Sequence, residues 1–470
     1  MVLSLAFATA HAQPAPVSKE PVSKKPVSKK PPASAKPGAK PKPVKKPELF
    51  PKRVTGWQAV KAAQLPAIKT FASDYLRYLA DAKTPRRAVG GLVKLFKGSA
   101  RQLKSTKRLD HAPGARYWFR HPGGDAAAFV TVGKRPIEEG ARIIIAAVDA
   151  PRIDLKQRPV YSKVGLTMLD TRLYGRLDLK SWLSRPLALY MYAKRRGRDL
   201  DLSVGDRATD PVLVIPDLLP HLSRKIQKKA IVDKPERMDA LAARSRKALL
   251  TYLRGKGVSE TVFRTAEASL VPAGKPSFIG VDRAMVAGYG HSQRALAFAA
   301  VRGLIDAPKT KTPHHTAIVL VISKSQVGYT GSTGLAFVKT AMSRIIGVMA
   351  SRGDKTDLLG VRRIYSKSAA LIAANRRGTP NKGLVLNPRV DDALPGALRR
   401  VLNAFRAAGA QYQIISSSGW GSKARTLSTM DMDAVDVGLP ITGRGTPMEL
   451  LSTLDLHQAR RALATWLMSK

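Results

Sequence analysis

Residues 316–349 read TAIVLVISKSQVGYTGSTGLAFVKTAMSRIIGVM, and this stretch decides the fold. Its first seven residues are almost all apolar or β-branched, which predicts a strand over 316–322 that is buried on both faces. A segment with several Gly and Ser residues follows, and beyond it the apolar residues recur at helical spacing. The stretch therefore predicts a strand, a glycine-containing turn and a helix over 333–350.

Helices and strands are predicted to alternate on both sides of this stretch. Beyond residue 236 we predict helices over 238–254, 293–305, 393–408 and 448–468, and strands over 266–271, 367–373, 411–416 and 433–437. Before it we predict a helix over 57–82, another from residue 87, and strands over 127–132, 143–148, 187–192 and 211–215. This alternation is typical of an α/β sheet with helices on both faces, and the strand-rich stretch 155–235 indicates an inserted β-rich domain.

The chain is strongly basic, with 81 Lys and Arg residues against 33 Asp and Glu residues and a net charge of +48. Residues 1–53 hold 12 basic and two acidic residues, so +38 belongs to the rest of the chain. Such a charge predicts a polyanionic partner, and RNA or DNA supplies one negative charge per phosphate. An unusually basic protein without such a partner, or a binder of anionic membranes, remains the alternative.

The N-terminal region divides into two segments. Residues 1–12 begin with an apolar run and end in Ala10-His11-Ala12, which is signal-like, although the basic residues that usually open a signal peptide are missing. Residues 13–53 repeat Pro-Val-Ser-Lys and then alternate Pro with Lys, a composition that cannot bury a core. We predict a disordered basic arm over 13–53, a first body segment over 54–154 and a second over 236–470.

Two features that the sequence lacks exclude some kinds of site and of membrane attachment. The chain has no cysteine, which excludes disulfides, thiolate catalysis and cysteine-based zinc sites. It also has no run of 18 apolar residues, so no transmembrane helix is predicted.

Seven short stretches in a fixed order resemble one enzyme family. They are residues 134–136 (KRP), 149–157 (DAPRIDLKQ), 171–175 (TRLYG), 215–222 (IPDLLPHL), 288–291 (GYGH), 328–334 (GYTGSTG) and 447–449 (PME). Together they resemble the aspartyl aminopeptidase family of zinc metallopeptidases in its bacterial form. The resemblance implies a zinc-exopeptidase-like mixed sheet flanked by helices, interrupted by a smaller β-rich domain that serves oligomerisation.

The resemblance also implies two zinc ions, held by two His and three carboxylates, with a further Glu as general base. At the matching positions the chain has Ala147, Gln293 beside Ser292, Ser323, Ser325, Gln326, Ala370 and Gly445. Ala and Gly carry no donor atom, and Gln cannot deprotonate a metal-bound water. From these positions we expect no metal, no cofactor and a catalytically inactive protein.

Clusters of basic residues are the remaining candidate contacts. The candidates for phosphate contacts are Lys24, Lys25, Lys29, Lys30, Lys45, Lys46, Lys194, Arg195, Arg196, Arg198, Arg376 and Arg377. Few aromatic residues accompany them, so the contacts would be electrostatic and would follow shape rather than sequence.

These observations lead to three functional hypotheses. The preferred one is a structural, RNA-binding subunit of a large ribonucleoprotein, a mitochondrial ribosome in particular, with rRNA and neighbouring proteins as partners and no small-molecule substrate. The second is an exported or periplasmic scaffold that binds anionic envelope polymers. The third is residual hydrolase activity through Ser323 or Ser325, for which no partner His is visible in the sequence. Homo-oligomers remain possible.

Overall fold

The computed structural model describes residues 56–103, 111–195, 197–217, 238–307, 312–323, 333–350, 358–373, 378–387, 395–415 and 431–470. Residues 54–470 form one compact unit. The signal-like segment 1–12 and the basic arm 13–53 lie outside the described residues. Within the described ranges, no helix is both long and apolar enough to cross a bilayer.

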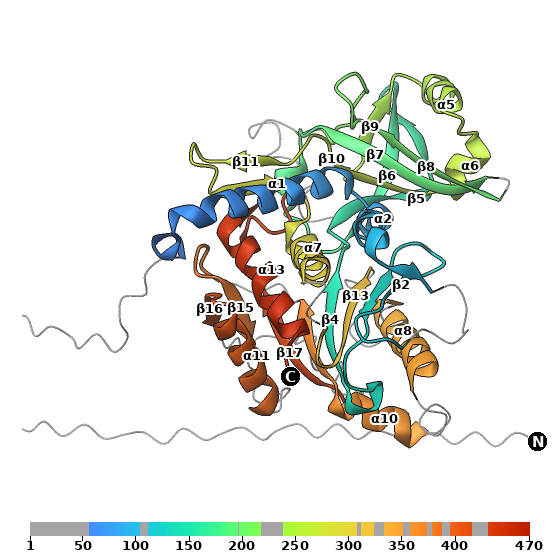
Figure 1. Cartoon of the computed structure of the whole chain (residues 1–470). Coiled ribbons are helices and arrows are strands. Elements are labelled where there is room, and N and C mark those ends of the chain that lie inside the picture. The colour runs from blue at the N-terminus through green and yellow to red at the C-terminus, as the bar shows by residue number, and fades with distance from the viewer. Residues whose placement is uncertain are drawn as a thin grey trace, which may run out of the picture. The chain divides into compact units, whose positions relative to one another are not determined.

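A nine-stranded mixed sheet forms the centre of this unit (Figure 1). In spatial order its strands are β1 (Arg101–Gln102), β2 (Arg116–Arg120), β3 (Ala127–Thr131), β13 (Thr316–Ile322), β4 (Ala141–Ala147), β14 (Ala369–Ala373), β17 (Asp433–Gly438), β15 (Leu384–Asn387) and β16 (Tyr412–Ile414). The neighbours β13, β4, β14 and β17 run parallel to one another, and most of their side chains are apolar and buried, with Arg142, Asp433 and Asp436 among the exceptions. The predicted α/β class, with a mixed sheet flanked by helices, is confirmed.

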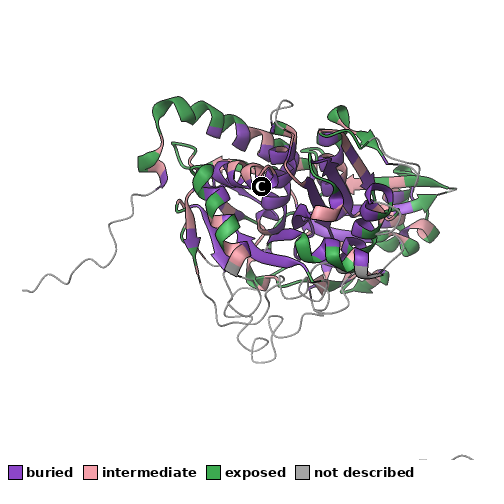
Figure 2. Ribbon diagram, turned by 60° about the horizontal axis from the view of Figure 1, so that its bottom comes forward, coloured by how far each residue is buried: buried purple, intermediate pink, exposed green. Residues whose placement is uncertain are grey.

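Helices cover both faces of the large sheet. One face packs against α1 (Leu65–Asp81), α2 (Pro85–Phe96), α7 (His291–Asp306), α11 (Pro395–Ala407) and α13 (Thr453–Leu467). The other face packs against α8 (Thr333–Met349) and α10 (Leu358–Lys367). The central strands are buried, whereas the edge strand β1 and the outer faces of the helices are exposed (Figure 2).

A second sheet has six strands and its own apolar core. Its spatial order is β8 (Arg198–Val204), β7 (Leu187–Arg195), β10 (Glu267–Pro272), β5 (Arg152–Lys163), β6 (Leu166–Tyr174) and β9 (Ala240–Ala243), with α3 (Leu179–Trp182), α5 (Arg246–Gly255) and α6 (Glu260–Thr265) nearby. The sheet thus takes strands β9 and β10 from beyond the predicted stretch 155–235. Residues 211–215, predicted as a strand, contribute only isolated bridges from Leu213 and Val214.

Two predicted helices begin with a strand instead. In the stretch 238–254, β9 comes first, and Ser245 then caps α5 through its hydroxyl. In the stretch 448–468, β19 (Glu449–Ser452) joins β11 (Ser277–Ile279), β12 (Met285–Gly288) and β18 (Ile441–Thr442) in a four-stranded sheet. Apolar spacing alone did not separate these short strands from the helices that follow them.

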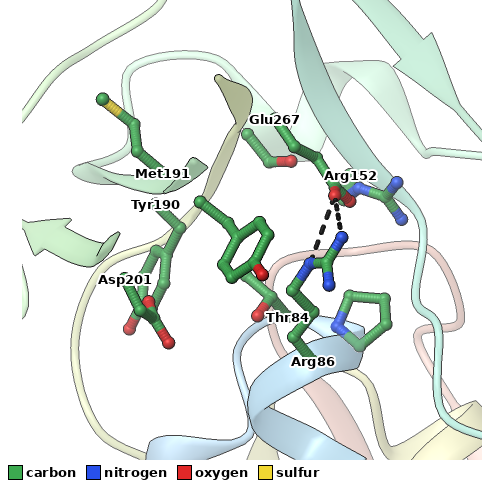
Figure 3. Close-up of a pocket in the computed structure, with 10 residues that line it drawn as sticks. Thr84, Arg86, Arg152, Tyr190, Met191, Asp201 and Glu267 are labelled. Carbon is green, nitrogen blue, oxygen red and sulfur yellow. Dashed lines mark hydrogen bonds and ion pairs between the residues drawn. The ribbon is translucent and has the colours of Figure 1, made fainter. Parts of the chain in front are cut away.

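Helix α2 is attached to the six-stranded sheet by stacked arginines. The Cζ atom of Arg86 lies 3.7 Å from the ring centroid of Tyr192, and that of Arg87 lies 4.6 Å from the ring of Tyr190. Arg86 also forms an ion pair of 2.9 Å with Glu267 (Figure 3). Each cation–π contact of this kind is worth roughly 0.5–2 kcal/mol, so the contacts fix the sheet against the helical layer.

The side chain of Asp455 in the first turn of α13 holds a loop in place. Its carboxylate accepts hydrogen bonds from the backbone N–H groups of Asn381 (2.8 Å) and Gly383 (2.9 Å). Asn381 in turn accepts hydrogen bonds from Gly56 and from the Trp57 indole, at the first described residues of the chain. Burial raises the pKa of Asp455 to about 7, although the two backbone hydrogen bonds oppose the shift.

This raised pKa predicts a specific pH dependence. Between about pH 4 and pH 7 the folded state keeps a proton on Asp455 that the unfolded chain releases, so the contribution of Asp455 to stability falls as pH rises. Buried His291 and His457, whose pKa values are lowered to about 3 and about 4, act in the opposite direction below their ordinary pKa. The difference in the free energy of unfolding between wild type and Asp455→Asn isolates the first effect. We expect this difference to change steadily between pH 4 and pH 7, and a constant difference would contradict the prediction.

Candidate functional site

The carboxyl ends of the parallel strands meet at one edge of the large sheet. There Ala147 ends β4 opposite Ile322 of β13, and the next N–H group, of Val148, donates to the carbonyl of Ile322. Helix α7 begins at the same corner, because Arg294 in its first turn donates from Nε to the carbonyl of Val148 (3.0 Å). Ligands of open α/β sheets bind at this type of edge, so it is the candidate site of this fold.

Glu449 caps the start of α7 from a distant part of the chain. Gly290, at the N-cap position of α7, has no side chain to accept the first amides. The Glu449 carboxylate takes that role and accepts from the Ser292 N–H (2.7 Å), the Ser292 hydroxyl (2.9 Å) and the Gly445 N–H (3.1 Å). Burial raises the pKa of Glu449, and the hydrogen bonds from Ser292 and Gly445 oppose that shift.

Asp149 lies two residues beyond Ala147 and is fully buried. Its carboxylate accepts a hydrogen bond of 2.6 Å from the hydroxyl of Tyr174. The guanidinium of Arg152 stacks on the same tyrosine ring at 3.9 Å and pairs with Asp154 at 2.7 Å. The retained DAPRID motif thus forms a packed charged wall beside the sheet edge.

Ser323 follows β13 and belongs to a chain of polar contacts. Its hydroxyl donates to Asp125 (2.6 Å), and the other oxygen of Asp125 lies 3.1 Å from Nδ1 of His121. The carboxylate therefore stands between the hydroxyl and the imidazole. In serine hydrolases the imidazole stands between the two, so the contacts of Ser323 do not form a hydrolase triad.

His291 is the buried histidine of this corner. Its Nδ1 lies 2.7 Å from the hydroxyl of Tyr75, and its Nε2 has no partner among the described residues. Burial, reinforced by the charge of Arg294, lowers the pKa of His291 to about 3. The imidazole is therefore neutral at physiological pH and belongs to the core.

The structure brings together some of the predicted ligand positions and separates one. Ala147, Gln293 and Gly445 meet around the start of α7, as the hydrogen bonds of Arg294 and Glu449 show. Ala370 pairs with Ile143, four residues before Ala147 on β4, which is about 13 Å away along the strand. Ser325 and Gln326 lie outside the described residues.

Three of the described positions, Ala147, Ala370 and Gly445, do not fit a role as zinc ligands. A side chain at Gly445 would have a φ of +83°, and its Cβ would lie 2.7 Å from the carbonyl oxygen of Arg176, so a histidine there requires a backbone shift. Ala147 and Ala370 offer no donor atoms. Within the described ranges no three His, Cys, Asp or Glu side chains are grouped to hold a metal ion.

The predicted basic contacts are only partly described. Lys194, Arg195 and Arg198 lie at the tip of the β7–β8 hairpin. Lys194 lies 3.5 Å from Asp199, and Arg195 donates to the carbonyl of Gly257. The positions outside the described residues are Lys24, Lys25, Lys29, Lys30, Lys45, Lys46, Arg196, Arg376 and Arg377.

A small cavity lies between α2 and the six-stranded sheet, away from the corner of α7. Thr84, Arg86, Arg152, Met191 and Glu267 are among its lining residues (Figure 3). Its volume of about 20 Å³ holds roughly one water molecule, so the cavity is too small for a substrate.

The fold defines an α/β protein with a mixed sheet flanked by helices. A family model described as aminopeptidase I zinc metalloprotease (M18) matches residues 78–376, and the chain belongs to this family. Probable M18 family aminopeptidases 1 from Borrelia garinii subsp. bavariensis and Clostridium acetobutylicum are 26% and 27% identical to it. The alignments cover 87% and 89% of this chain and 98% and 99% of those relatives.

Solved structures show the same fold. The M18 aminopeptidase of Thermotoga maritima superposes with a TM-score of 0.79 at 23% identity, over 90% of this chain and 100% of that one. Aminopeptidase I of Borrelia burgdorferi B31 gives a TM-score of 0.75 at 22% identity, over 88% and 100% of the two chains.

The comparisons overturn the functional predictions made from the sequence. The prediction of an RNA-binding ribosomal subunit is wrong, because the matched family and the relatives are aminopeptidases. The scaffold alternative and the prediction of a protein that is not an enzyme are overturned by the same finding. For the RNA-binding prediction, the physical reason is that net charge reports on solubility and association and carries no information about fold or chemistry. The predicted compartment, partners and oligomeric state stay predictions.

Proposed function

We propose that the chain acts on the N-terminal end of peptides, at the carboxyl edge of the large sheet. One observation carries this proposal: the chain aligns with M18 aminopeptidases over 98% or more of their own length. The corner described above is therefore built on the same scaffold as theirs, and no domain of those relatives is missing from the alignment.

Asp125 is the residue we assign to the peptide ammonium group. A free N-terminus carries a positive charge and several N–H donors, so it needs a carboxylate that solvent and ligand can reach. Asp149 and Glu449 are enclosed, with 0% and 1% of their surfaces exposed. The side chain of Asp125 is 14% exposed and lies beside Ser323 at the end of β13.

The proposal includes no step through a metal ion. In relatives of the matched family, zinc is the group that supplies hydrolytic chemistry, but the described positions here do not fit two zinc ions. The chain's own residues provide a carboxylate for the ammonium group and a surface that the Asp149–Tyr174 hydrogen bond makes rigid.

The test uses the full-length protein and short peptides with a free or an acetylated N-terminus. We expect the free peptides to bind at least about tenfold more tightly, because acetylation removes the charge that Asp125 recognises. A panel of aminoacyl p-nitroanilides, with chelator or with added Zn²⁺, Co²⁺ or Mn²⁺, measures the release of the first residue in parallel.

Asp125→Asn is the variant that locates the site. We expect it to weaken binding of free peptides and leave that of acetylated peptides unchanged, while Asp282→Asn, in the exposed β11–β12 hairpin, serves as the matched control. If free and acetylated peptides behave alike, and no substrate in the panel is cleaved under any condition, the proposed function is wrong.

A further inference from the structure

The opposite, amino edge of the large sheet contains a buried arginine whose Nε atom lacks a hydrogen-bond partner in the part of the chain that the structure describes. Arg142, near the start of β4, is only 5% exposed. Its Nε atom is buried and has no hydrogen-bond partner among the described residues. An uncompensated buried charge costs several kcal/mol, so native structures pair such groups or bind counter-ions to them.

The strand register places Asp433 two strands away from Arg142. Ala369 of β14 is the neighbour of Arg142 on one side and of Asp433 on the other. The carboxylate of Asp433 is turned to Arg400 of α11, which donates to it at 2.7 Å. Burial, together with the positive charge of Arg400, lowers the pKa of Arg142 to about 10. The small Ala369 side chain thus separates two guanidinium groups.

The surroundings of Arg142 also include three aromatic side chains, each with a ring nitrogen that has no hydrogen-bond partner among the described residues. The Cζ atom of Arg142 lies 5.8 Å from the ring centroid of Trp466, whose indole Nε1 is buried without a partner. His314 and His315, immediately before β13, stack at 4.7 Å, and the Nδ1 atom of each is likewise buried without a partner. The charge of Arg142 acts on His315 and helps burial to lower its pKa to about 4.

Together with Nε of Arg142 itself, these three ring nitrogens are buried polar atoms without a partner among the described residues, whereas more than about 90% of buried polar groups are normally satisfied. We propose that Arg142, Arg400, Trp466 and His315 bind a small tetrahedral oxyanion, inorganic phosphate or sulfate. Guanidinium and ring N–H groups are hydrogen-bond donors, which the several oxygens of such an ion can accept. The slight exposure of Arg142 favours a free ion over a phosphate ester on a larger molecule.

Thermal unfolding of the full-length protein tests this proposal. At constant ionic strength, we expect phosphate and sulfate to raise Tm by about 3 °C when their concentration is about 100-fold above Kd, while acetate does not. Isothermal titration with inorganic phosphate should give one site per chain. Glycerol phosphate is the second ligand to be titrated, and we expect it to bind more weakly than free phosphate.

Arg142→Met is the central variant. Because it removes an unpaired buried charge, we expect it to fold, to be at least as stable as wild type in acetate buffer, and to lose the response to phosphate. Arg399→Met, an exposed neighbour of Arg400 on α11, should keep the full response. Should Arg142→Met fail to fold, Arg400→Met, which keeps Arg142, should weaken phosphate binding at least about tenfold.

A basic protein also attracts anions without any specific site, and the same data separate the two cases. An equal rise in Tm for wild type and Arg142→Met, or the absence of a saturable heat in the titration of wild type, would overturn the proposal. Tighter binding of glycerol phosphate than of phosphate would overturn the assignment to a free ion.

Discussion

Glu449→Ala is expected to lower the free energy of unfolding by about 3–5 kcal/mol, because it removes a buried acceptor and leaves its donors without partners. The Ser292 N–H, the Ser292 hydroxyl and the Gly445 N–H all lose their acceptor at once. The first turn of α7 loses the negative charge that complements its dipole. Chemical denaturation followed by circular dichroism measures the change.

Two further variants make this result specific. Glu449→Gln keeps the shape and one acceptor oxygen, so we expect its cost to be smaller than that of Glu449→Ala. Glu260→Ala removes an exposed partner of Arg246 and should change stability by less than about 1 kcal/mol. A Glu449→Ala protein within about 1 kcal/mol of wild type would show that Glu449 does not hold α7.

Gly383→Ala is expected to destabilise the protein by about 4 kcal/mol or more, through a steric conflict that cannot relax locally. An added Cβ would lie 1.9 Å from the carbonyl oxygen of Gln411, and φ at Gly383 is +78°. Relief of the overlap would pull the Gly383 N–H away from Asp455, which it now bonds at 2.9 Å. The same change would loosen the loop that accepts hydrogen bonds from Gly56 and Trp57.

Gly274→Ala is the matched control, because it separates backbone strain from steric overlap. Gly274 has a φ of +94°, but nothing lies within 4 Å of an added Cβ. Its substitution should cost only about 1–2 kcal/mol, the usual cost of placing an L-residue in the left-handed region. Equal losses for the two variants, measured by urea denaturation, would contradict the steric explanation.

Long buried elements of this fold follow directly from the sequence. The strand predicted over 316–322 and the helix predicted over 333–350 match Thr316–Ile322 and Thr333–Met349 almost residue for residue. Strands β9 and β19 were missed, because a run of four residues next to a helix looks like its continuation. Their strand character comes from partners far away, such as Val286 of β12 opposite Leu451 of β19.

The candidate site was harder to predict from the sequence than the fold was. Motif order indicated Ala147, Gln293 and Gly445, and the structure brings these three together. The roles of Glu449, Asp125 and Arg142 depend on partners more than 100 residues away, or on a partner that is missing, and no periodicity reports such contacts. The PME motif contained Glu449, but its spacing gave no hint of a helix cap.

The cap on α7 also bears on the order in which the chain acquires its structure. Ser292 and its acceptor Glu449 are 157 residues apart. At a synthesis rate of about 5–20 residues per second, the ribosome delivers the acceptor roughly 8–30 s after the helix that needs it. During that interval nascent α7 has its first amides open to water or to a chaperone, so its docking on β4 becomes one of the last events of folding.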